Sequence, residues 1–328
     1  MAKFLIIQTA FIGDVILATP LIERLHTDFP QAQIDFLLRK GNEGLLQDHP
    51  FLNRLYIWDK KKGKYANLLS FVKIFRKEKY DHVINLQRFF STGLLTVFSG
   101  AKHRIGFTKN PWSFLFSTGY CHVIDTSKGQ THEIDRNLLL LSGITNSQER
   151  HMPRLYPSAT DLACVPNQPY ITMSPTSVWY TKQYPPERWA EVIKLVPSTI
   201  SIYLLGGKSD FEACENIRNA ITDPENIFNM AGKLTFLQSA AYMKSAQMNY
   251  VNDSAPLHMA SSMEAPVTAI FCSTTPKFGF GPLHSNSRVV ESSPLPKCKP
   301  CGLHGYKACP ENHFKCAEID PAMVLGNI

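Results

Sequence analysis

The sequence has no long apolar run. No stretch approaches the roughly 18 consecutive apolar residues of a membrane-spanning helix. The apolar start, Met1 to Gln8, is too short for a signal peptide and has no small-residue cleavage site after it. We therefore expect a cytoplasmic protein that touches a membrane only from its surface.

Familiar nucleotide and nucleic-acid signatures are absent too. The sequence contains neither the G-x-G-x-x-G fingerprint nor the Walker A spacing. It also shows none of the modular signatures of nucleic-acid-binding domains, which makes nucleic acid the poorest fit among partners. A nucleotide site, if present, must be built in another way.

What is present is an ordinary globular composition with a basic excess. The 328 residues are 44% hydrophobic and 19% charged, and the length favours two domains. The formal net charge of +7 fits an anionic partner such as a phosphorylated substrate or an anionic membrane face, although many proteins carry such a surplus without one.

Short apolar runs alternate with helical stretches on both sides of a proline-rich segment at 151–169. This alternation predicts two α/β domains with mainly parallel sheets, 1–160 and 161–328, the second ending in a cysteine-rich tail. Pro20 indicates that the helical stretch 15–22 is kinked or begins near it. The predicted strands are 3–8, 33–38, 54–58, 82–86, 170–174, 200–205, 248–251 and 267–271, and the predicted helices of the second domain are 187–195, 211–220 and 256–263.

Polar residues follow the predicted strands, where open α/β sheets bind ligands. Gly13 and Asp14 follow the first strand, and Asp14 could act there as a general base or simply as a helix cap. The loop with Thr176, Ser177 and Lys182 suits a diphosphate, or is a solvated loop with one lysine.

Two further strand ends carry candidate residues. Leu205 is followed by Gly206, Gly207, Lys208, Ser209 and Asp210. The two glycines either only make a turn or lie against a nucleotide. Val251 is followed by Asn252-Asp253-Ser254-Ala255-Pro256-Leu257-His258, in which Asp253 or Ser254 can cap a helix whose free amides attract an anion. Taken alone, this D-S-x-x-x-H pattern is weak.

The tail and a basic stretch leave their roles open. Cys298, Cys301, Cys309 and Cys316 have zinc-like spacing at one end, with reduced thiols or a disulfide as alternatives. Residues 60–65, 76–79 and 88–90 combine Lys and Arg with aromatic side chains. Such a surface suits an anionic glycolipid, or is a solvated face.

The order of these blocks resembles glycosyltransferase family 9, the lipopolysaccharide heptosyltransferases. Residues 4–20 resemble its strand–Gly-Asp–helix–Pro block, 176–185 its diphosphate loop ending in Lys-x-Tyr-Pro, and 253–271 its Asp-Ser block with a following His. The tail resembles the Cys-x-Pro-Cys layout of many members. Ala255 departs from the usual glycine.

The resemblance implies a fold and roles. The fold is GT-B, with two Rossmann-like α/β domains facing across a cleft. Asp14 would be the base and Lys182 would hold the departing diphosphate. Donor binding would fall to Thr176, Ser177, Lys182, Gly207, Ser209, Asp210, Asp253, Ser254, Ala255 and His258, and the acceptor side to Gly13, Lys60, Lys64 and Arg88.

The implied activity is inverting transfer of a heptose or related sugar from an ADP-sugar to a lipid-linked, phosphorylated lipopolysaccharide core acceptor. No cofactor would be required beyond the zinc considered above, and the enzyme would sit at the inner face of the inner membrane. The alternatives are a nucleotide-sugar epimerase of the same architecture and a non-catalytic nucleotide-sugar or glycolipid-binding protein.

Overall fold

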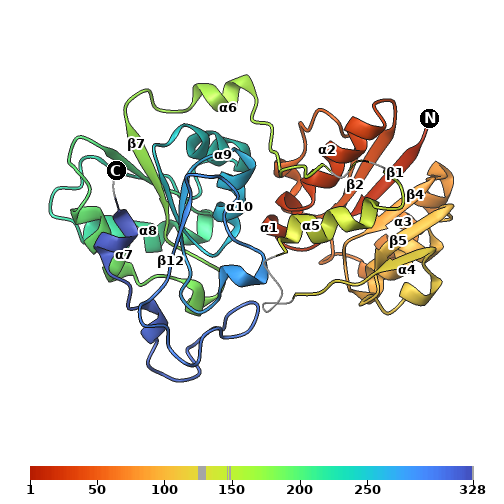
Figure 1. Ribbon diagram of the computed structural model, residues 1–328. Coiled ribbons are helices and arrows are strands. Elements are labelled where there is room, and N and C mark those ends of the chain that lie inside the picture. The colour runs from red at the N-terminus through yellow and green to blue at the C-terminus, as the bar shows by residue number, and fades with distance from the viewer. Residues whose placement is uncertain (125–130, 146, 148, 327–328) are drawn as a thin grey trace. The chain divides into compact units, whose positions relative to one another are not determined.

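The computed structural model describes residues 1–124, 131–145, 147 and 149–326, without the side chains of residues 64 and 65. These residues form two compact units, the first ending at Tyr156 and the second beginning at Pro157 (Figure 1). The boundary falls slightly before the predicted division after residue 160. Each unit contains one six-stranded parallel sheet.

The sheet of the first unit has the strand order β3-β2-β1-β4-β5-β6. Phe4 of β1 pairs with Ile34 on one side and with His82 on the other, so β1 lies inside the sheet. The strands are β1 (Lys3–Ile7), β2 (Gln33–Arg39), β3 (Arg54–Trp58), β4 (His82–Asn85), β5 (His103–Phe107) and β6 (Thr118–Tyr120).

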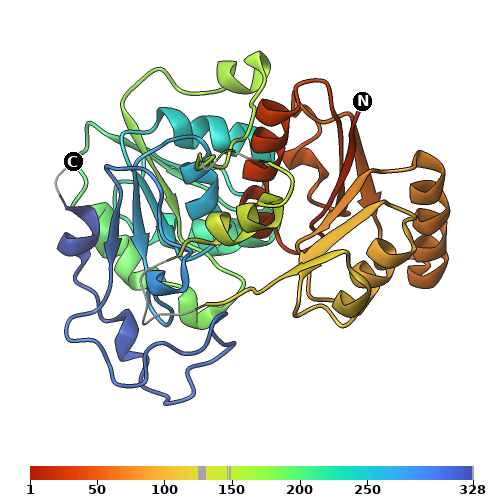
Figure 2. The same cartoon turned by 45° about the vertical axis from the view of Figure 1, so that its right-hand side comes forward.

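Helices cover both faces of this sheet. Figures 1 and 2 show α3 and α4 on one face and α2 with α5 on the other. Leu5, Ile7, Leu37 and Phe75 belong to the core beneath α3 and α4. The helices are α1 (Ile12–Ile16), α2 (Thr19–Asp28), α3 (Lys64–Glu78), α4 (Phe90–Phe98) and α5 (Glu133–Leu138), with 3-10 turns η1 (Glu43–Leu45), η2 (Ser113–Leu115) and η3 (Leu139–Leu141).

The sheet of the second unit has the order β12-β11-β10-β7-β8-β9, which repeats the topology of the first unit. Val251 of β10 pairs with Ser174 of β7 and Ala269 of β11. The strands are β7 (Tyr170–Ser174), β8 (Ser201–Leu204), β9 (Ile227–Asn229), β10 (Asn249–Asn252), β11 (Val267–Ile270) and β12 (Arg288–Val290).

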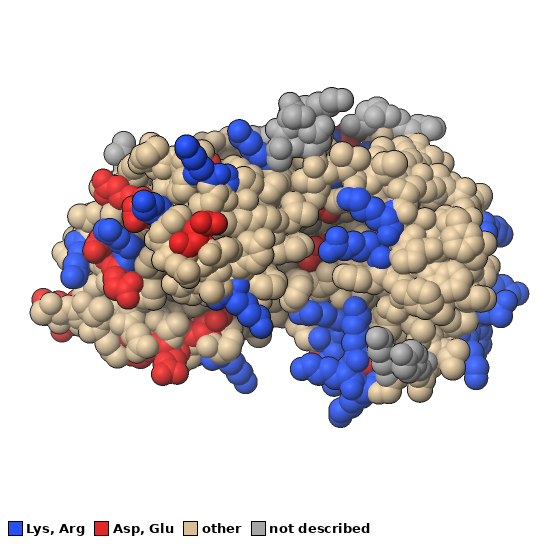
Figure 3. Space-filling model, turned by 90° about the horizontal axis from the view of Figure 1, so that it is seen from below, with Lys and Arg blue, Asp and Glu red and all other residues tan. Residues whose placement is uncertain are grey.

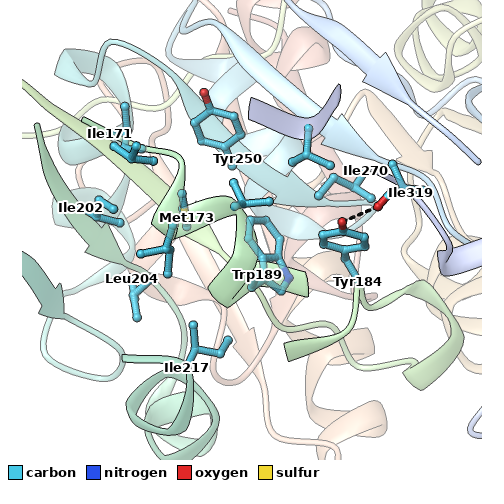
Figure 4. Packing of buried hydrophobic residues seen from close by; sticks show 14 of the residues in the cluster. Ile171, Met173, Tyr184, Trp189, Ile202, Leu204, Ile217, Tyr250, Ile270 and Ile319 are labelled. Carbon is cyan, nitrogen blue, oxygen red and sulfur yellow. Dashed lines mark hydrogen bonds between the residues drawn. The ribbon is translucent and has the colours of Figure 1, made fainter. Parts of the chain in front are cut away.

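Aliphatic and aromatic side chains fill the core of this unit. Trp189 and Tyr184 pack against residues of the central strands, and the Tyr184 hydroxyl donates a hydrogen bond of 2.6 Å to the carbonyl of Ile319 (Figure 4). The helices are α6 (Ala159–Ala163), α7 (Pro186–Lys194), α8 (Phe211–Asn219), α9 (Phe236–Ser245), α10 (Ala255–Ser262) and α11 (Pro321–Leu325), with η4 (Tyr180–Lys182), η5 (Lys208–Asp210), η6 (Pro276–Phe278) and η7 (Lys315–Ala317).

In both units the strand order reverses beside the first strand. The turning points are between β1 and β4 in the first unit and between β7 and β10 in the second. Loops leaving the two strands at such a point diverge and leave a crevice at the carboxyl edge of the sheet. The segments with Asp14, Lys182 and Asp253 all follow one of these strands.

Several local expectations can be compared with the structure. Gly13 and Asp14 follow β1, as expected, but they lie inside α1. Pro20 occupies the first turn of α2, where its missing N–H costs nothing, so a helix begins near Pro20, which was one of the two expected alternatives. The proline-rich segment contains the short helix α6, which Ser158 and Asp161 cap reciprocally.

Candidate active site

In the second unit, Lys182 and Asp253 meet at the turning point of the sheet. The Lys182 ammonium lies 2.7 Å from Asp253 Oδ2, and the two side chains are 14% and 7% exposed. The Thr274 hydroxyl donates a 2.5 Å hydrogen bond to the same carboxylate oxygen. The loops that leave β7 and β10 are therefore joined by a nearly buried ion pair.

Asn252 and Tyr184 fix these two loops in place. The Asn252 side chain donates to the Pro175 carbonyl at 2.8 Å and accepts from the Tyr184 backbone N–H at 2.9 Å. Because the Tyr184 ring is buried in the core, the turn that carries Lys182 is anchored at its end. Thr176 and Ser177 lie half-buried earlier in the same loop.

The cysteine-rich tail supports the Lys182 turn from another side. Thr181 and Tyr306 exchange hydrogen bonds: the Thr181 N–H donates to the Tyr306 carbonyl at 3.1 Å, and the Tyr306 N–H donates to the Thr181 hydroxyl at 2.8 Å. Gly305, at φ +74°, lies so close that a Cβ would stand 2.9 Å from Thr181 Oγ1 and 3.2 Å from Lys182 Cγ. The tail thus contributes to the shape of the candidate site.

Helix α10 begins immediately after Asp253. Ser254 is its N-cap residue with extended backbone, but within the described part of the chain its side chain makes no capping hydrogen bond. The Asp253 carboxylate is held by Lys182 and Thr274 instead, which corrects the prediction that one of these two residues caps the helix. Ala255 opens the helix and His258 is buried one turn further on. The helix N-terminus carries a partial positive charge that can stabilise an anion.

The glycine turn after β8 lies against a second glycine. The Gly232 N–H donates to the Gly206 carbonyl at 2.9 Å, and a Cβ on Gly232 would come within 2.8 Å of the Lys208 backbone. The Asp210 carboxylate accepts the Gly207 N–H at 2.7 Å, while Ser209 is exposed. The loop with Gly232 therefore lies next to the glycine turn that the sequence offered as a nucleotide site.

In the first unit, Asp14 is the third residue of α1 and accepts the Phe11 N–H at 3.1 Å. Phe11 is the N-cap residue of α1, and Asp14 stabilises the helix start by accepting the N–H of that residue with Oδ2. Its other oxygen, Oδ1, can be considered as a base. Burial, and next the negative charge of Glu133, raise the pKa of the Asp14 carboxyl to about 6. A base whose pKa lies near neutrality suits proton transfer at physiological pH.

Glu133 belongs to a buried polar cluster that the sequence did not single out. Its carboxylate lies 3.0 Å from His122 Nε2 and 2.7 Å from Arg136 Nε. Burial opposes ionisation of Glu133, but the hydrogen bonds and charges of His122 and Arg136 lower its pKa below the ordinary value. No spacing in the sequence links residues 122 and 133 to residue 14, so only the fold reveals this neighbour of Asp14.

The residues expected on the acceptor side are distributed along the carboxyl edge of the first sheet. Lys60 donates to the Thr9 carbonyl at 3.0 Å and to its hydroxyl at 2.9 Å, and its ammonium lies over the Trp58 ring. Arg88 is exposed after β4, and Gly13 lies in α1. Lys64 begins α3, and its side chain is outside the described part of the structure.

The four tail cysteines are free thiols, Cys316 buried and the other three half-buried. His313 Nε2 lies 3.8 Å from Cys298 Sγ. Among the described residues, no three His, Cys, Asp or Glu side chains are gathered closely enough to hold a metal ion. Structural zinc stays a prediction.

Comparison with known proteins places the chain in a family. The sequence pattern described as glycosyltransferase family 9 (heptosyltransferase) matches residues 68–305, which is well over half of the chain. The chain belongs to glycosyltransferase family 9. The predictions of this family and of the GT-B class are confirmed.

Individual relatives agree with the family assignment. Lipopolysaccharide heptosyltransferase 3 of Escherichia coli is 28% identical over 280 residues, covering 80% of this chain and 82% of that protein. The structure of E. coli ADP-heptose lps heptosyltransferase II matches with TM-score 0.80 at 23% identity, covering 98% of this chain and 96% of that one. E. coli heptosyltransferase WaaC with ADP-2-deoxy-2-fluoro heptose matches with TM-score 0.74 at 17% identity, covering 91% and 95%. This family 9 chain therefore shares the fold over nearly its whole length.

Proposed function

We propose that this family 9 glycosyltransferase moves a heptose, or a closely related sugar, from an ADP-sugar to a lipopolysaccharide core acceptor. The observation that carries the proposal is the Lys182–Asp253 pair at the turning point of the second sheet, beside the N-terminus of α10. Support also comes from the solved relative WaaC, which holds an ADP-sugar analogue.

The second unit would hold the donor. Lys182, the hydroxyls of Thr176 and Ser177 and the first amides of α10 supply positive charge and hydrogen-bond donors for a diphosphate. The Asp253 carboxylate accepts a hydrogen bond from a sugar hydroxyl, or it orients Lys182. Because Lys182 and the helix N-terminus stabilise the negative charge that develops on the leaving ADP, the step needs no divalent cation.

The first unit would hold the acceptor, with Asp14 as the base. Asp14 takes the proton of the acceptor hydroxyl while that oxygen forms a bond to the anomeric carbon. The bond from the anomeric carbon to the diphosphate breaks, and its electron pair leaves with ADP. One displacement of this kind inverts the anomeric centre.

The test is a direct transfer assay. The chain is mixed with a deacylated core acceptor and ADP-heptose in the presence of EDTA, and mass spectrometry monitors the acceptor. We expect the acceptor to gain one heptose with the unaltered chain and not with Asp14→Asn or Lys182→Met. Lys194→Met is the matched control, because Lys194 is an exposed lysine at the end of α7.

Thermal stabilisation by ADP-, GDP- and UDP-sugars identifies the donor, since specific binding raises the apparent stability. Stabilisation without transfer to any core acceptor would favour a non-catalytic binding protein. Donor isomerisation without an acceptor would favour an epimerase.

A further inference from the structure

Four aromatic side chains form a surface patch on the first unit. Phe90 and Phe98 lie on α4, Trp112 directly precedes η2, and Phe114 lies in η2. The Trp112 ring centroid lies 5.1 Å from that of Phe90, 6.0 Å from Phe98 and 6.5 Å from Phe114. Phe90, Phe98 and Phe114 are 59%, 44% and 77% exposed. We call these four residues the aromatic patch.

Helix α4 buries Leu95 in the core, but at other positions it departs from the usual distribution of polarity. Thr92 and Thr96 are fully buried and satisfy their hydroxyls within the helix, whereas Phe90 and Phe98 face outward. An ordinary surface helix buries its apolar residues and exposes its polar ones. Exposed apolar side chains that gather in one place, rather than singly, mark interaction sites.

The patch rests on a rigid support. The Asn110 side chain is buried and donates to the carbonyls of Gln87 at 2.8 Å and Phe89 at 3.1 Å, while accepting the Trp112 N–H at 2.9 Å. A Cβ on Gly93 would come within 2.1 Å of Asn110 Oδ1 and 2.8 Å of Trp112 Cδ1, so this glycine allows the loop to lie on α4. Through Gln87, the support is tied to the end of β4, next to Arg88.

The sequence around the patch is strongly biased in charge. Residues 82–124 include Arg88, Lys102, Arg104 and Lys109 but not one Asp or Glu. Residues 1–156 contain 21 of the 34 Lys and Arg residues and 13 of the 27 Asp and Glu residues, so this part carries +8 and the remainder −1. Figure 3 shows Lys and Arg atoms bordering a broad uncharged area on this unit, with few Asp and Glu atoms.

We propose that the aromatic patch docks the enzyme on an anionic lipid bilayer, with Phe90 and Phe114 entering the interfacial layer and the surrounding Lys and Arg residues facing lipid phosphates. Aromatic rings prefer the membrane–water interface, and cationic side chains beside it are attracted by anionic lipids. The proposal rests on the proposed function, because a lipid-linked acceptor is presented at such a surface.

Charge complementarity selects this occupant. A carboxylate-free stretch of this length matches a surface of uniform negative charge, whereas protein partners present both signs. The hydrogen bond from the Asn110 side chain to the Gln87 carbonyl also connects the docking surface with the segment after β4. This segment carries Arg88, which is expected on the acceptor side.

The experiment measures cosedimentation of the full chain with vesicles of pure phosphatidylcholine and of equal parts phosphatidylcholine and phosphatidylglycerol. We expect binding to the anionic vesicles only. Phe90→Ala with Phe114→Ala should weaken it by about tenfold or more, because each exposed ring loses its partial burial in the interface. Lys109→Gln should weaken it by about fivefold, the contribution of one cationic side chain near an anionic surface.

Leu162→Ala with Leu195→Ala is the matched control, since both leucines are exposed apolar residues of the second unit. Equal vesicle binding by the Phe90/Phe114 variant and the unaltered chain would overturn the proposal. A second result would also overturn it. In that result, the unaltered chain forms a concentration-dependent dimer, seen by light scattering, but does not bind vesicles, and the Phe90/Phe114 variant does not form the dimer.

Sugar transfer to a deacylated acceptor separates this proposal from the proposed function. The Phe90/Phe114 variant should keep that activity and lose transfer to an acceptor embedded in anionic vesicles. If the unaltered chain ignores vesicles but still transfers to the deacylated acceptor, docking is refuted and the transferase assignment stands. If neither acceptor is used while vesicles are bound, the transferase assignment fails instead.

Discussion

The rate of sugar transfer should fall steeply below pH 6 because Asp14 must be ionised to act as the base. Burial and the charge of Glu133 raise the pKa of its carboxyl from 3.8 to about 6. A base with that pKa is about 91% ionised at pH 7 and about 9% ionised at pH 5, so the rate should fall by roughly tenfold between these values. With the ordinary pKa of 3.8, the rate would hardly change over this interval.

The raised pKa of the Asp14 carboxyl should also make the stability of the protein depend on pH. The native state holds the Asp14 proton more tightly than the unfolded chain, so its contribution to stability is fully present below pH 3.8 and is lost as the pH rises to about 6. The loss is at most about 3 kcal/mol, from about 1.4 kcal/mol for each pKa unit. Asp14→Asn should therefore be more stable than the unaltered chain above pH 6 and lose this advantage near pH 4.

The assays are initial rates with saturating donor from pH 5 to 8 and urea unfolding over the same range. Glu133→Gln should move the acid limb of the rate to lower pH, because it removes the neighbouring negative charge. Glu149→Gln, an exposed glutamate of the same unit, should leave the limb in place. A rate that is flat from pH 5 to 7, or an Asp14→Asn variant that still transfers sugar, would show that Asp14 only caps α1.

Two further perturbations probe the donor side. Lys182→Met and Asp253→Asn should each lower the free energy of unfolding by about 3 kcal/mol, because each leaves a nearly buried charge without its partner. In urea unfolding, the double variant should lose about 1–3 kcal/mol less than the sum of the two single losses. Strict additivity of the two losses would contradict direct pairing of Lys182 with Asp253. Gly305→Ala should raise KM for the donor and lower kcat, because the added Cβ presses on Thr181 and Lys182 at a positive φ. Unchanged steady-state kinetics would show that the tail does not shape the site.

Much of the fold could be predicted from sequence because the central strands are continuous apolar runs. Strands 3–8, 33–38 and 170–174 were foreseen to within about a residue, since parallel strands buried on both faces leave this signal. Four strands were not predicted. Three of them, β6, β9 and β12, have only three residues each and lie at sheet edges. The fourth, β5 (His103–Phe107), lies inside the first sheet but begins with His103 and Arg104, so it is not a continuous apolar run. Their assignment depends on pairing with a neighbour, which no local pattern encodes.

The candidate site was predictable only where a residue directly follows a strand. Lys182 and Asp253 could be named, but their 2.7 Å contact depends on β7 and β10 being neighbours in the sheet. Glu133 could not be named as a neighbour of Asp14, because a glutamate in the first turn of a helix is ordinary. Likewise, α4 reads as a plain apolar helix, and only its packing reveals that the threonines are inside and the phenylalanines outside.

The cysteine-rich tail shows how a segment can matter to a site without supplying a reactive group. Its spacing directed attention to the thiols, yet its contacts with the Lys182 turn include the backbone of Tyr306, Gly305 and the Phe314 ring, which stacks on Tyr180. The Cys301 N–H also donates to the Ser273 carbonyl at 2.7 Å, and the Ser273 hydroxyl donates to Thr181 at 3.0 Å. Any bond or ion that holds the tail together would thus also hold Lys182 against Asp253, so the integrity of the tail and the affinity for the donor diphosphate should vary together.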